Sequence, residues 1–238
     1  MNIAVCIGAM PPAGITVFMT TAQNGVTFCK AGENDIRSEQ SYIQLKKQFD
    51  IKNLITLHQR HSADIVNVGG ESFATYNGAS GDGLFTASDG LVLGVMTADC
   101  FPVMLAGKKC IAALHCGWRG TLKGIIANAA NMFAEHGDAP EYAYIGAGIS
   151  KEAFIVQDDF VSEAKKYITP EPYLFEEFGK RCFDLARLIK DQLEYHRVNS
   201  VECLNICTYG DRRFHSYRRD GENAGRMLSV IYRTTASL

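Results

Sequence analysis

Long apolar runs are missing from this 238-residue sequence, and their absence excludes one class of protein. No segment approaches the roughly 20 consecutive apolar residues that a membrane-spanning helix needs. The opening residues, MNIAVCIGAM, also lack the positively charged start of a secretory signal. We therefore expect a soluble protein of the cytoplasm that does not associate with membranes.

A strong net charge and a disulfide framework are missing as well. The 24 Lys and Arg residues nearly balance the 26 Asp and Glu residues, so no basic field is present to attract nucleic acid. The 8 cysteines are scattered along a chain too long for a small disulfide scaffold, and we expect most of them to be reduced. The expected partner is a small molecule, and the pattern leaves open a monomer or a small homo-oligomer.

Repeats, low-complexity tracts and Pro/Ser-rich linkers are absent too, which favours a single domain over residues 1–238. Extended, β-branched or alternating runs predict many strands. They lie at residues 15–20, 54–68, 91–97, 110–115, 142–147, 201–207 and 227–234.

Helical periodicity is clearest at Leu122, Ile125, Ile126, Ala129 and Phe133, with Thr121 as the expected N-cap. A second helix is predicted over residues 185–195 after Asp184, and weaker signals lie at 39–49 and 160–167. Strands and helices interleave without a regular βαβ order, which predicts an α+β fold or a mixed α/β fold rather than a doubly wound parallel sheet.

Three apolar segments end in side chains that bind metal ions. They are LITLHQRHSADIV with His58 and His61, LVLGVMTADCFPV with Asp99 and Cys100, and IAALHCGWRG with His115 and Cys116. Two imidazoles and one thiolate suit zinc or copper, and an incomplete protein shell leaves a position for substrate. The spacing matches no local metal-binding motif, so ordinary burial of each side chain remains the alternative.

Four segments, TLHQRHSADIV, GVMTADCFPVML, AALHCGWRG and FHSYRRDGENAGRM, together resemble the signature blocks of a known family. It is variously called multicopper polyphenol oxidase, laccase-domain protein, peptidoglycan editing factor and purine nucleoside phosphorylase. The resemblance implies a metal triad of His61, Cys100 and His115. It also implies one domain in which two mixed sheets pack between helices, a four-layer αββα sandwich.

Three arginines of these blocks are candidates for binding phosphate, because guanidinium groups are planar, permanently charged and bidentate. We assign Arg119 to catalysis, and Arg218 and Arg219 to substrate binding. The alternative for each arginine is a structural ion pair, since Asp220 follows Arg219. Asp99 is a further catalytic candidate that could orient Arg119 or a metal ligand.

Other residues of the blocks receive simpler assignments. Gln59 is assigned to substrate binding, and Cys100 to catalysis in addition to ligation. His58 and Cys116 stand at positions that the resemblance does not mark as ligands, and we expect both to be bystanders. His215 is expected to be structural or to face solvent.

The sequence also departs from the family pattern near its start. Where relatives carry a TRxGGVS-like block, this chain reads TTAQNGVT, with Ala22 in place of the arginine and Asn24 in place of the first glycine. The next block is not recognisable in FCKAGEND, the asparagine–arginine pair expected around residues 38–42 is missing, and a GPxI block reads GAGI at 146–149. We expect these positions to line the substrate side.

The resemblance implies phosphorolysis of adenosine, inosine or methylthioadenosine by a zinc enzyme, with copper as the alternative metal. Adenosine deamination is a related activity, because zinc lowers the pKa of bound water toward about 7. Two other functions stay open: a cysteine-dependent hydrolase of peptidoglycan editing with Cys100 as nucleophile, and a copper-dependent polyphenol oxidase. One His–Cys–His set has fewer ligands than blue-copper and trinuclear sites need.

Overall fold

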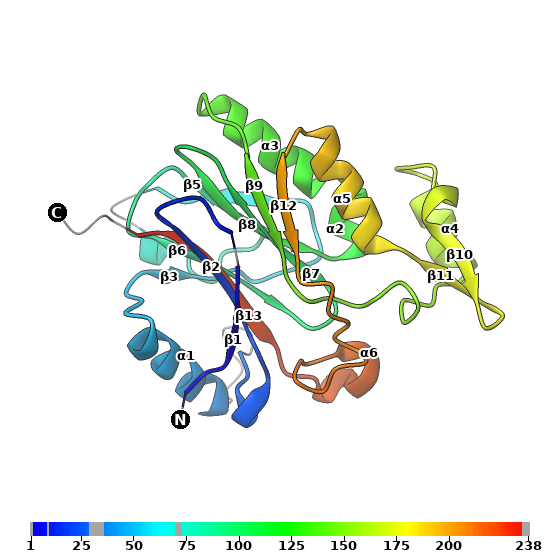
Figure 1. Ribbon diagram of the computed structural model, residues 1–238, viewed down its shortest axis with the longest axis horizontal. Helices are drawn as coiled ribbons and strands as arrows, with labels where there is room; N and C mark the ends of the chain where they lie inside the picture. The colour runs from blue at the N-terminus through cyan, green and yellow to red at the C-terminus, as the bar shows by residue number, and fades with distance from the viewer. Residues whose placement is uncertain (1, 9, 29–35, 70–72, 235–238) are drawn as a thin grey trace.

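The strands of the computed structural model, which describes residues 2–8, 10–28, 36–69 and 73–234, form two mixed sheets and a separate hairpin (Figure 1). The first sheet has the order β1 (Val5–Ile7), β2 (Ile15–Thr20), β13 (Met227–Arg233), β6 (Val92–Thr97) and β3 (Leu54–Ile55). The second has the order β12 (Ser200–Cys203), β9 (Tyr142–Ile145), β7 (Phe101–Ala106), β8 (Ile111–Cys116), β5 (Gly83–Thr86) and β4 (Ile65–Asn67). The hairpin pairs β10 (Leu174–Glu177) with β11 (Lys180–Phe183).

Helices cover the outer face of each sheet, which confirms the predicted αββα sandwich. One face of the first sheet packs on α1, and the outer face of the second packs on α2, α3 and α5 (Figure 1). The helices are α1 (Ile36–Gln48), α2 (Trp118–Leu122), α3 (Ile125–Glu135), α4 (Asp158–Ala164), α5 (Leu185–Tyr195) and α6 (Tyr217–Asp220). Because each sheet is apolar on both faces, β6, β7 and β8 are buried at every residue.

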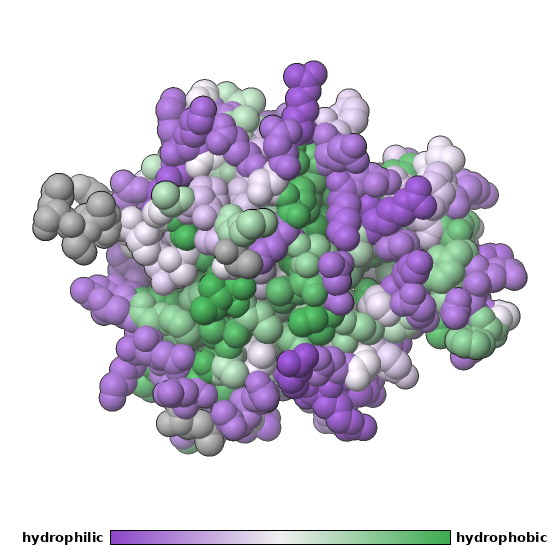
Figure 2. Space-filling model, viewed as in Figure 1, coloured by the Kyte–Doolittle hydropathy of each residue, from purple (hydrophilic) through white to green (hydrophobic). Residues whose placement is uncertain are grey.

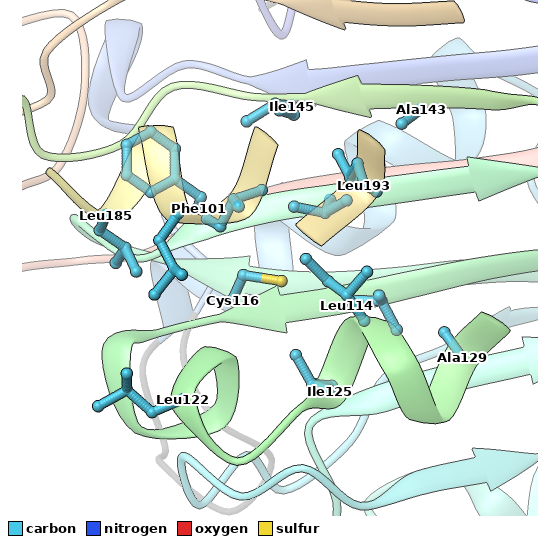
Figure 3. Packing of buried hydrophobic residues seen from close by; sticks show 14 of the residues in the cluster. Phe101, Leu114, Cys116, Leu122, Ile125, Ala129, Ala143, Ile145, Leu185 and Leu193 are labelled. Atoms are coloured by element: carbon cyan, nitrogen blue, oxygen red, sulfur yellow. The ribbon is translucent and has the colours of Figure 1, made fainter. Parts of the chain in front are cut away.

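Side chains of β8 alternate between two cores. Leu114 and Cys116 face the helices and pack with Phe101, Leu122 and Ile125, as Figure 3 shows. Ala113 faces the opposite way, into the core between the two sheets. His115, the neighbour of Cys116, therefore points away from the helix-covered core, and the two adjacent side chains have separate surroundings.

The helix after β8 differs from the prediction. Thr121 does not cap it but lies inside α2, where its hydroxyl donates to the Gly117 carbonyl at 3.0 Å. The chain then breaks at Gly124, whose φ of 86° only glycine adopts readily, and α3 begins after it. The predicted cap at Asp184 is confirmed, since its carboxylate accepts from the Arg187 N–H at 2.9 Å.

The continuous strand predicted over residues 54–68 is wrong. Only β3 and β4 form at its two ends, and His58 makes an isolated bridge to Ser80 in the loop between them. The start of this segment lies in the first sheet and its end in the second. The apolar pattern is continuous along the segment and does not reveal that the chain passes from one sheet to the other. That crossing loop carries His61.

Figure 2 shows mostly hydrophilic side chains on this face of the molecule, with hydrophobic surface at the centre, around the positions of β1 and β12. Ile7 of β1 is 61% exposed and Val201 of β12 is 39% exposed. In the part of the chain that the structure describes, no helix has the length and apolarity to cross a bilayer.

Candidate metal centre

His61, Cys100 and His115 come together at one end of the second sheet. Their potential ligand atoms lie within 4.8 Å of one another, and the Cys100 Sγ is 3.9 Å from the His61 Nε2. The pairing of β7 with β8 explains part of this geometry, because Phe101 lies opposite Cys116 and Pro102 opposite His115. Cys100, directly before β7, is thereby held beside the end of β8.

Asp82, which the sequence analysis did not identify, bonds to both histidine segments of the centre. Its side chain is fully buried, and Oδ1 accepts a hydrogen bond from His115 Nδ1 at 2.7 Å. The same carboxylate accepts from the backbone N–H groups of Arg60, His61 and Ser62 at 3.0, 2.9 and 2.7 Å. Asp82 therefore fixes the ring of one histidine and the loop of the other, and leaves the Nε2 of His115 facing the centre.

The backbone around the ligands is unusual. His61 and Asp99 have φ values of 59° and 90°, in the left-handed region that non-glycine residues seldom adopt. At Gly117 an added Cβ would lie 2.9 Å from the Cys100 Sγ and 3.0 Å from the His61 Cδ2. The ligands can therefore approach one another only because position 117 has no side chain. Such local strain persists where the surrounding structure holds it, and it is common at functional sites.

The protonation of the centre follows from its contacts. Burial alone would raise the pKa of the Cys100 thiol, but the charge and hydrogen bonds of His115, followed by those of His61, lower this pKa to about 6. Burial would lower the pKa of His115, but the Cys100 charge and the hydrogen bond to Asp82 raise it to about 9. The arrangement favours a thiolate at Cys100, the form in which cysteine binds metals.

The donor set fits a zinc ion. With Zn–S near 2.3 Å and Zn–N near 2.0–2.1 Å, tetrahedral ligands lie about 3.6 Å apart, close to the distance of 3.9 Å between Cys100 Sγ and His61 Nε2. Three protein ligands leave a fourth position, which is typical of catalytic rather than structural zinc sites. Among the described residues, His61, Cys100 and His115 form a group of three side chains that could hold a metal ion, and no second group of three His, Cys, Asp or Glu side chains is found there.

The centre opens into a cavity of about 510 Å³, within the usual size range of small-molecule sites. Part of its wall is apolar, formed by Met96, Trp118, Ile149, Phe154 and Leu185. Three arginines also line it, Arg119, Arg218 and Arg226. The cavity therefore combines a surface for a flat aromatic group with positive charge for an anion.

Two of the predicted site residues have their polar atoms engaged with the fold. The Gln59 side chain accepts from the Met96 N–H at 2.8 Å and donates to the Met96 carbonyl at 2.7 Å. The Asp99 carboxylate accepts from the Thr208 hydroxyl and from the Arg218 backbone N–H, each at 2.6 Å. Both residues line the cavity, and both connect the ligand loops to neighbouring elements.

The predicted arginines are placed differently from one another. Arg119 lies over the Trp118 ring, 4.1 Å from its centroid, and faces the cavity. Arg218 also lines the cavity and donates from its side chain to the carbonyls of Ala153 and Ile155 at 3.1 and 3.3 Å. The structure does not bring Arg219 to the cavity wall.

Arg219 instead holds its own segment together. Its side chain forms an ion pair with Asp220, with an N–O distance of 2.8 Å, and donates to the carbonyls of Thr208, Tyr209 and Phe214. This is the structural ion pair that the sequence left open as the alternative.

The expected bystanders lie away from the ligand atoms. Cys116 is fully buried in the core under α2, α3 and α5, where burial raises the pKa of its thiol. His215 donates from Nε2 to the Val26 carbonyl at 2.8 Å, and His58 lies at the bridge to Ser80.

The altered block near the start of the chain meets the cavity wall only at its end. Thr27 and Phe28 bond to the backbone of Arg226, at 3.2 and 2.9 Å. Residues 29–35, which contain most of the unrecognisable FCKAGEND segment, lie outside the described residues. Of the altered GAGI block, Ile149 lines the cavity.

Comparison with known proteins agrees with this architecture. Residues 24–234 match the family described as multi-copper polyphenol oxidoreductase laccase. A purine nucleoside phosphorylase of Clostridium acetobutylicum is 34% identical over 231 residues, which is 91% of each chain. The purine nucleoside phosphorylase YfiH of Escherichia coli is 30% identical over 241 residues, covering 93% of this chain and 95% of its own.

Solved structures show the same fold. The crystal structure of YlmD from Geobacillus stearothermophilus superimposes with a TM-score of 0.85 at 26% identity, and the match covers 99% of this chain and 97% of that one. A Neisseria meningitidis protein of the DUF152 family superimposes with a TM-score of 0.81 at 28% identity, covering 99% of this chain and 100% of that one.

Proposed function

The chain belongs to the family described as multi-copper polyphenol oxidoreductase laccase, and from this premise we propose that it is a zinc-dependent purine nucleoside phosphorylase. We propose adenosine, inosine and methylthioadenosine as its substrates, with adenosine deamination as a second activity. The names carried by its relatives support phosphorolysis. We further propose that it works in the cytoplasm as a single domain over residues 1–238, as a monomer or a small homo-oligomer.

One observation carries the proposal. The His61, Cys100 and His115 ligand atoms, within 4.8 Å of one another, share a cavity of about 510 Å³ with three arginines. Phosphorolysis requires a site for a purine, a site for phosphate and a means of stabilising the charge that develops as the base departs. The apolar wall, the guanidinium groups and the ligand triad supply these three requirements in one place.

We infer the following roles for the residues of this chain. Arg119 and Arg218 bind phosphate and hold it beside the anomeric carbon of the sugar, because a fixed guanidinium orients an oxyanion through paired hydrogen bonds. Asp99 fastens the turn that carries Cys100 to the backbone of Arg218, so the triad and the phosphate site keep a constant separation. Trp118 stacks on Arg119 and restricts its motion.

The metal has a defined place in this proposal. His61, Cys100 and His115 would hold zinc, and Asp82 would keep the His115 ring in the orientation that ligation needs. When bound, zinc supplies Lewis-acid polarisation of a substrate atom at its open coordination position.

A second candidate function rests on a specific contact. Cys100, His115 and Asp82 form a Cys–His–Asp series in which the thiol pKa is lowered to about 6, an arrangement that also suits a cysteine nucleophile. That chemistry would hydrolyse peptide or amide bonds. Copper-dependent polyphenol oxidation receives less support, because one His–Cys–His set has fewer ligands than a blue-copper centre with its trinuclear partner.

The test is product analysis with metal-quantified protein. Adenosine and inosine are incubated with and without phosphate, and the bases and sugar products are separated. Free adenine or hypoxanthine formed only with phosphate supports phosphorolysis, and inosine formed from adenosine supports deamination. No product from zinc-loaded wild type would exclude the nucleoside assignment. A metal-free protein whose Cys100 is selectively alkylated would favour the hydrolase.

A further inference from the structure

The rim of the cavity carries a carboxylate that the proposed roles leave unused. Of the described residues that line the cavity, Asp99 and Glu222 are the carboxylates. Both oxygens of Asp99 are engaged, one by Thr208 and one by the Arg218 N–H. Glu222 is exposed, and its Oε1 accepts a hydrogen bond from the Tyr217 hydroxyl at 2.7 Å. In the described part of the chain, no other hydrogen bond or ion pair engages the Glu222 side chain.

The segment that presents Glu222 is fixed with respect to the metal centre. Glu222 lies in the short 3₁₀ helix Gly221–Asn223, which directly follows α6 (Figure 1). The N–H of Arg218 in α6 donates to Asp99, the neighbour of Cys100, at 2.6 Å. Arg219 pins the same helix to the carbonyls of Thr208, Tyr209 and Phe214. The segment that carries Glu222 is therefore fixed relative to the ligand triad.

The surroundings of Glu222 indicate what it could bind. Arg218 and Arg226 line the same cavity, but the ion pairs found among the described residues do not join either of them to Glu222. A carboxylate accepts hydrogen bonds and donates none, so its ligand must present donors. The tyrosine hydroxyl occupies one acceptor position on Oε1 and orients the group, and among the described residues no hydrogen bond engages Oε2.

We propose that Glu222 binds the 2′,3′-diol of the ribose and that Tyr217 orients its carboxylate, an inference that rests on the proposed nucleoside phosphorylase function. Two vicinal hydroxyls offer two donors to one carboxylate, which is how acidic residues recognise ribose in nucleotide-binding proteins. A 2′-deoxyribose offers one of these donors. Glu222 thus makes the protein selective for ribonucleosides, with the phosphate held by the arginines beside it.

The experiment compares adenosine with 2′-deoxyadenosine in phosphorolysis by the zinc-loaded protein. A hydrogen bond to a charged group predicts about 10- to 100-fold higher kcat/KM for the ribonucleoside in wild type, expressed mainly in KM. In Glu222→Ala this preference falls to about threefold or less, and kcat/KM decreases more for adenosine than for 2′-deoxyadenosine. Tyr217→Phe gives an intermediate preference, because the carboxylate remains but is no longer oriented.

A matched control is Glu194→Ala, which removes another exposed glutamate, at the end of α5 and outside the cavity lining. It keeps the wild-type preference. If Glu222→Ala retained the wild-type ratio, or changed only the ratio between adenosine and inosine, ribose recognition by Glu222 would be overturned while the proposed function stood. Wild type that phosphorolyses no nucleoside overturns the proposed function and this inference together.

Discussion

Replacing Asp82 by Asn tests how the centre is held. The buried carboxylate accepts hydrogen bonds from the backbone N–H groups of Arg60, His61 and Ser62 and from the His115 ring. The amide keeps one acceptor oxygen and turns a donor toward two of these N–H groups. Since a hydrogen bond to a charged group contributes about 1.5–3 kcal/mol, we expect the metal-free variant to lose about 3–5 kcal/mol of unfolding free energy.

The same substitution is expected to weaken zinc binding. The ring of His115 loses the partner that sets its orientation, and such outer partners commonly change metal affinity by about 10- to 100-fold. Zinc affinity is measured by competition with a chromophoric chelator, and stability by urea unfolding of the chelator-treated protein. The stability measurement reports on the hydrogen bonds from Asp82 to the loop that carries His61, and the zinc affinity reports on the orientation of the His115 ring.

The chain offers a matched control in Asp138. Its carboxylate also accepts from three consecutive backbone N–H groups, those of Lys108, Lys109 and Cys110, at 3.1, 2.8 and 2.8 Å, but within the described residues no hydrogen bond joins it to a histidine ring. Asp138→Asn should lower stability and leave zinc affinity unchanged. Equal zinc affinity in Asp82→Asn and Asp138→Asn would refute the argument that Asp82 orients a metal ligand.

Three further predictions concern the ligands themselves. Gly117→Ala places a methyl group 2.9 Å from the Cys100 Sγ, so zinc affinity should fall about tenfold or more in the chelator assay, and unchanged affinity would contradict the close packing. Cys100→Ser should abolish stoichiometric zinc in metal analysis, whereas Cys116→Ser, on the opposite face of β8, should retain it; zinc lost only in Cys116→Ser would contradict the assignment of the ligand. In metal-free protein the lowered pKa of Cys100, about 6, gives stability that is present above its unfolded value near 9 and lost as pH falls toward 6. The raised pKa of His115, about 9, gives stability that is present below 6.5 and lost as pH rises through 9, so the two contributions offset each other and the melting temperature should change little between about pH 6.5 and 9. The thiolate is measured directly by the rate of Cys100 alkylation against pH, and a midpoint near 9 instead of near 6 would contradict the thiolate–imidazolium pair.

Much of the fold could be predicted because its strands and helices carry strong local patterns. Residues 15–20 form β2 as predicted, and the Asp184 cap begins α5. No strand was predicted at residues 101–106, where β7 forms. Pro102 lies near the start of β7, and pairing with β9 begins only at Val103, so the missing N–H interrupts little of the ladder.

The candidate site was predictable only in part. His61, Cys100 and His115 were found by resemblance, and the structure brings them together through strand pairing that no local pattern reveals. Asp82 was missed because it lies in the glycine-rich segment ASGDG, which is typical of a loop. Its partners are 18 to 33 residues away in sequence, so only the folded chain shows its role.

Glu222 escaped notice for another reason. An exposed glutamate in a polar turn is the commonest kind of surface residue, and nothing in DGEN distinguishes it. Two features of the folded chain mark it as a candidate: Glu222 lines the cavity, and its carboxylate accepts a hydrogen bond from the Tyr217 hydroxyl. Metal-binding residues such as His and Cys are rare, so a sequence pattern can locate them. An exposed glutamate is common, so its contacts become visible only in the folded chain.

The fastening of the ligand loops by Asp82 and Gln59 has a consequence for metal acquisition. Asp82 accepts from backbone N–H groups of the loop that carries His61, and Gln59 ties the same loop to Met96 of β6, and neither side chain is one of the proposed ion ligands. We therefore expect the chain to fold before the proposed ion binds, and one ion to replace another without unfolding. Because copper competes strongly for imidazole and thiolate donors, we expect any ion bound at the proposed centre to reflect the metal supply of the cells that produced the protein.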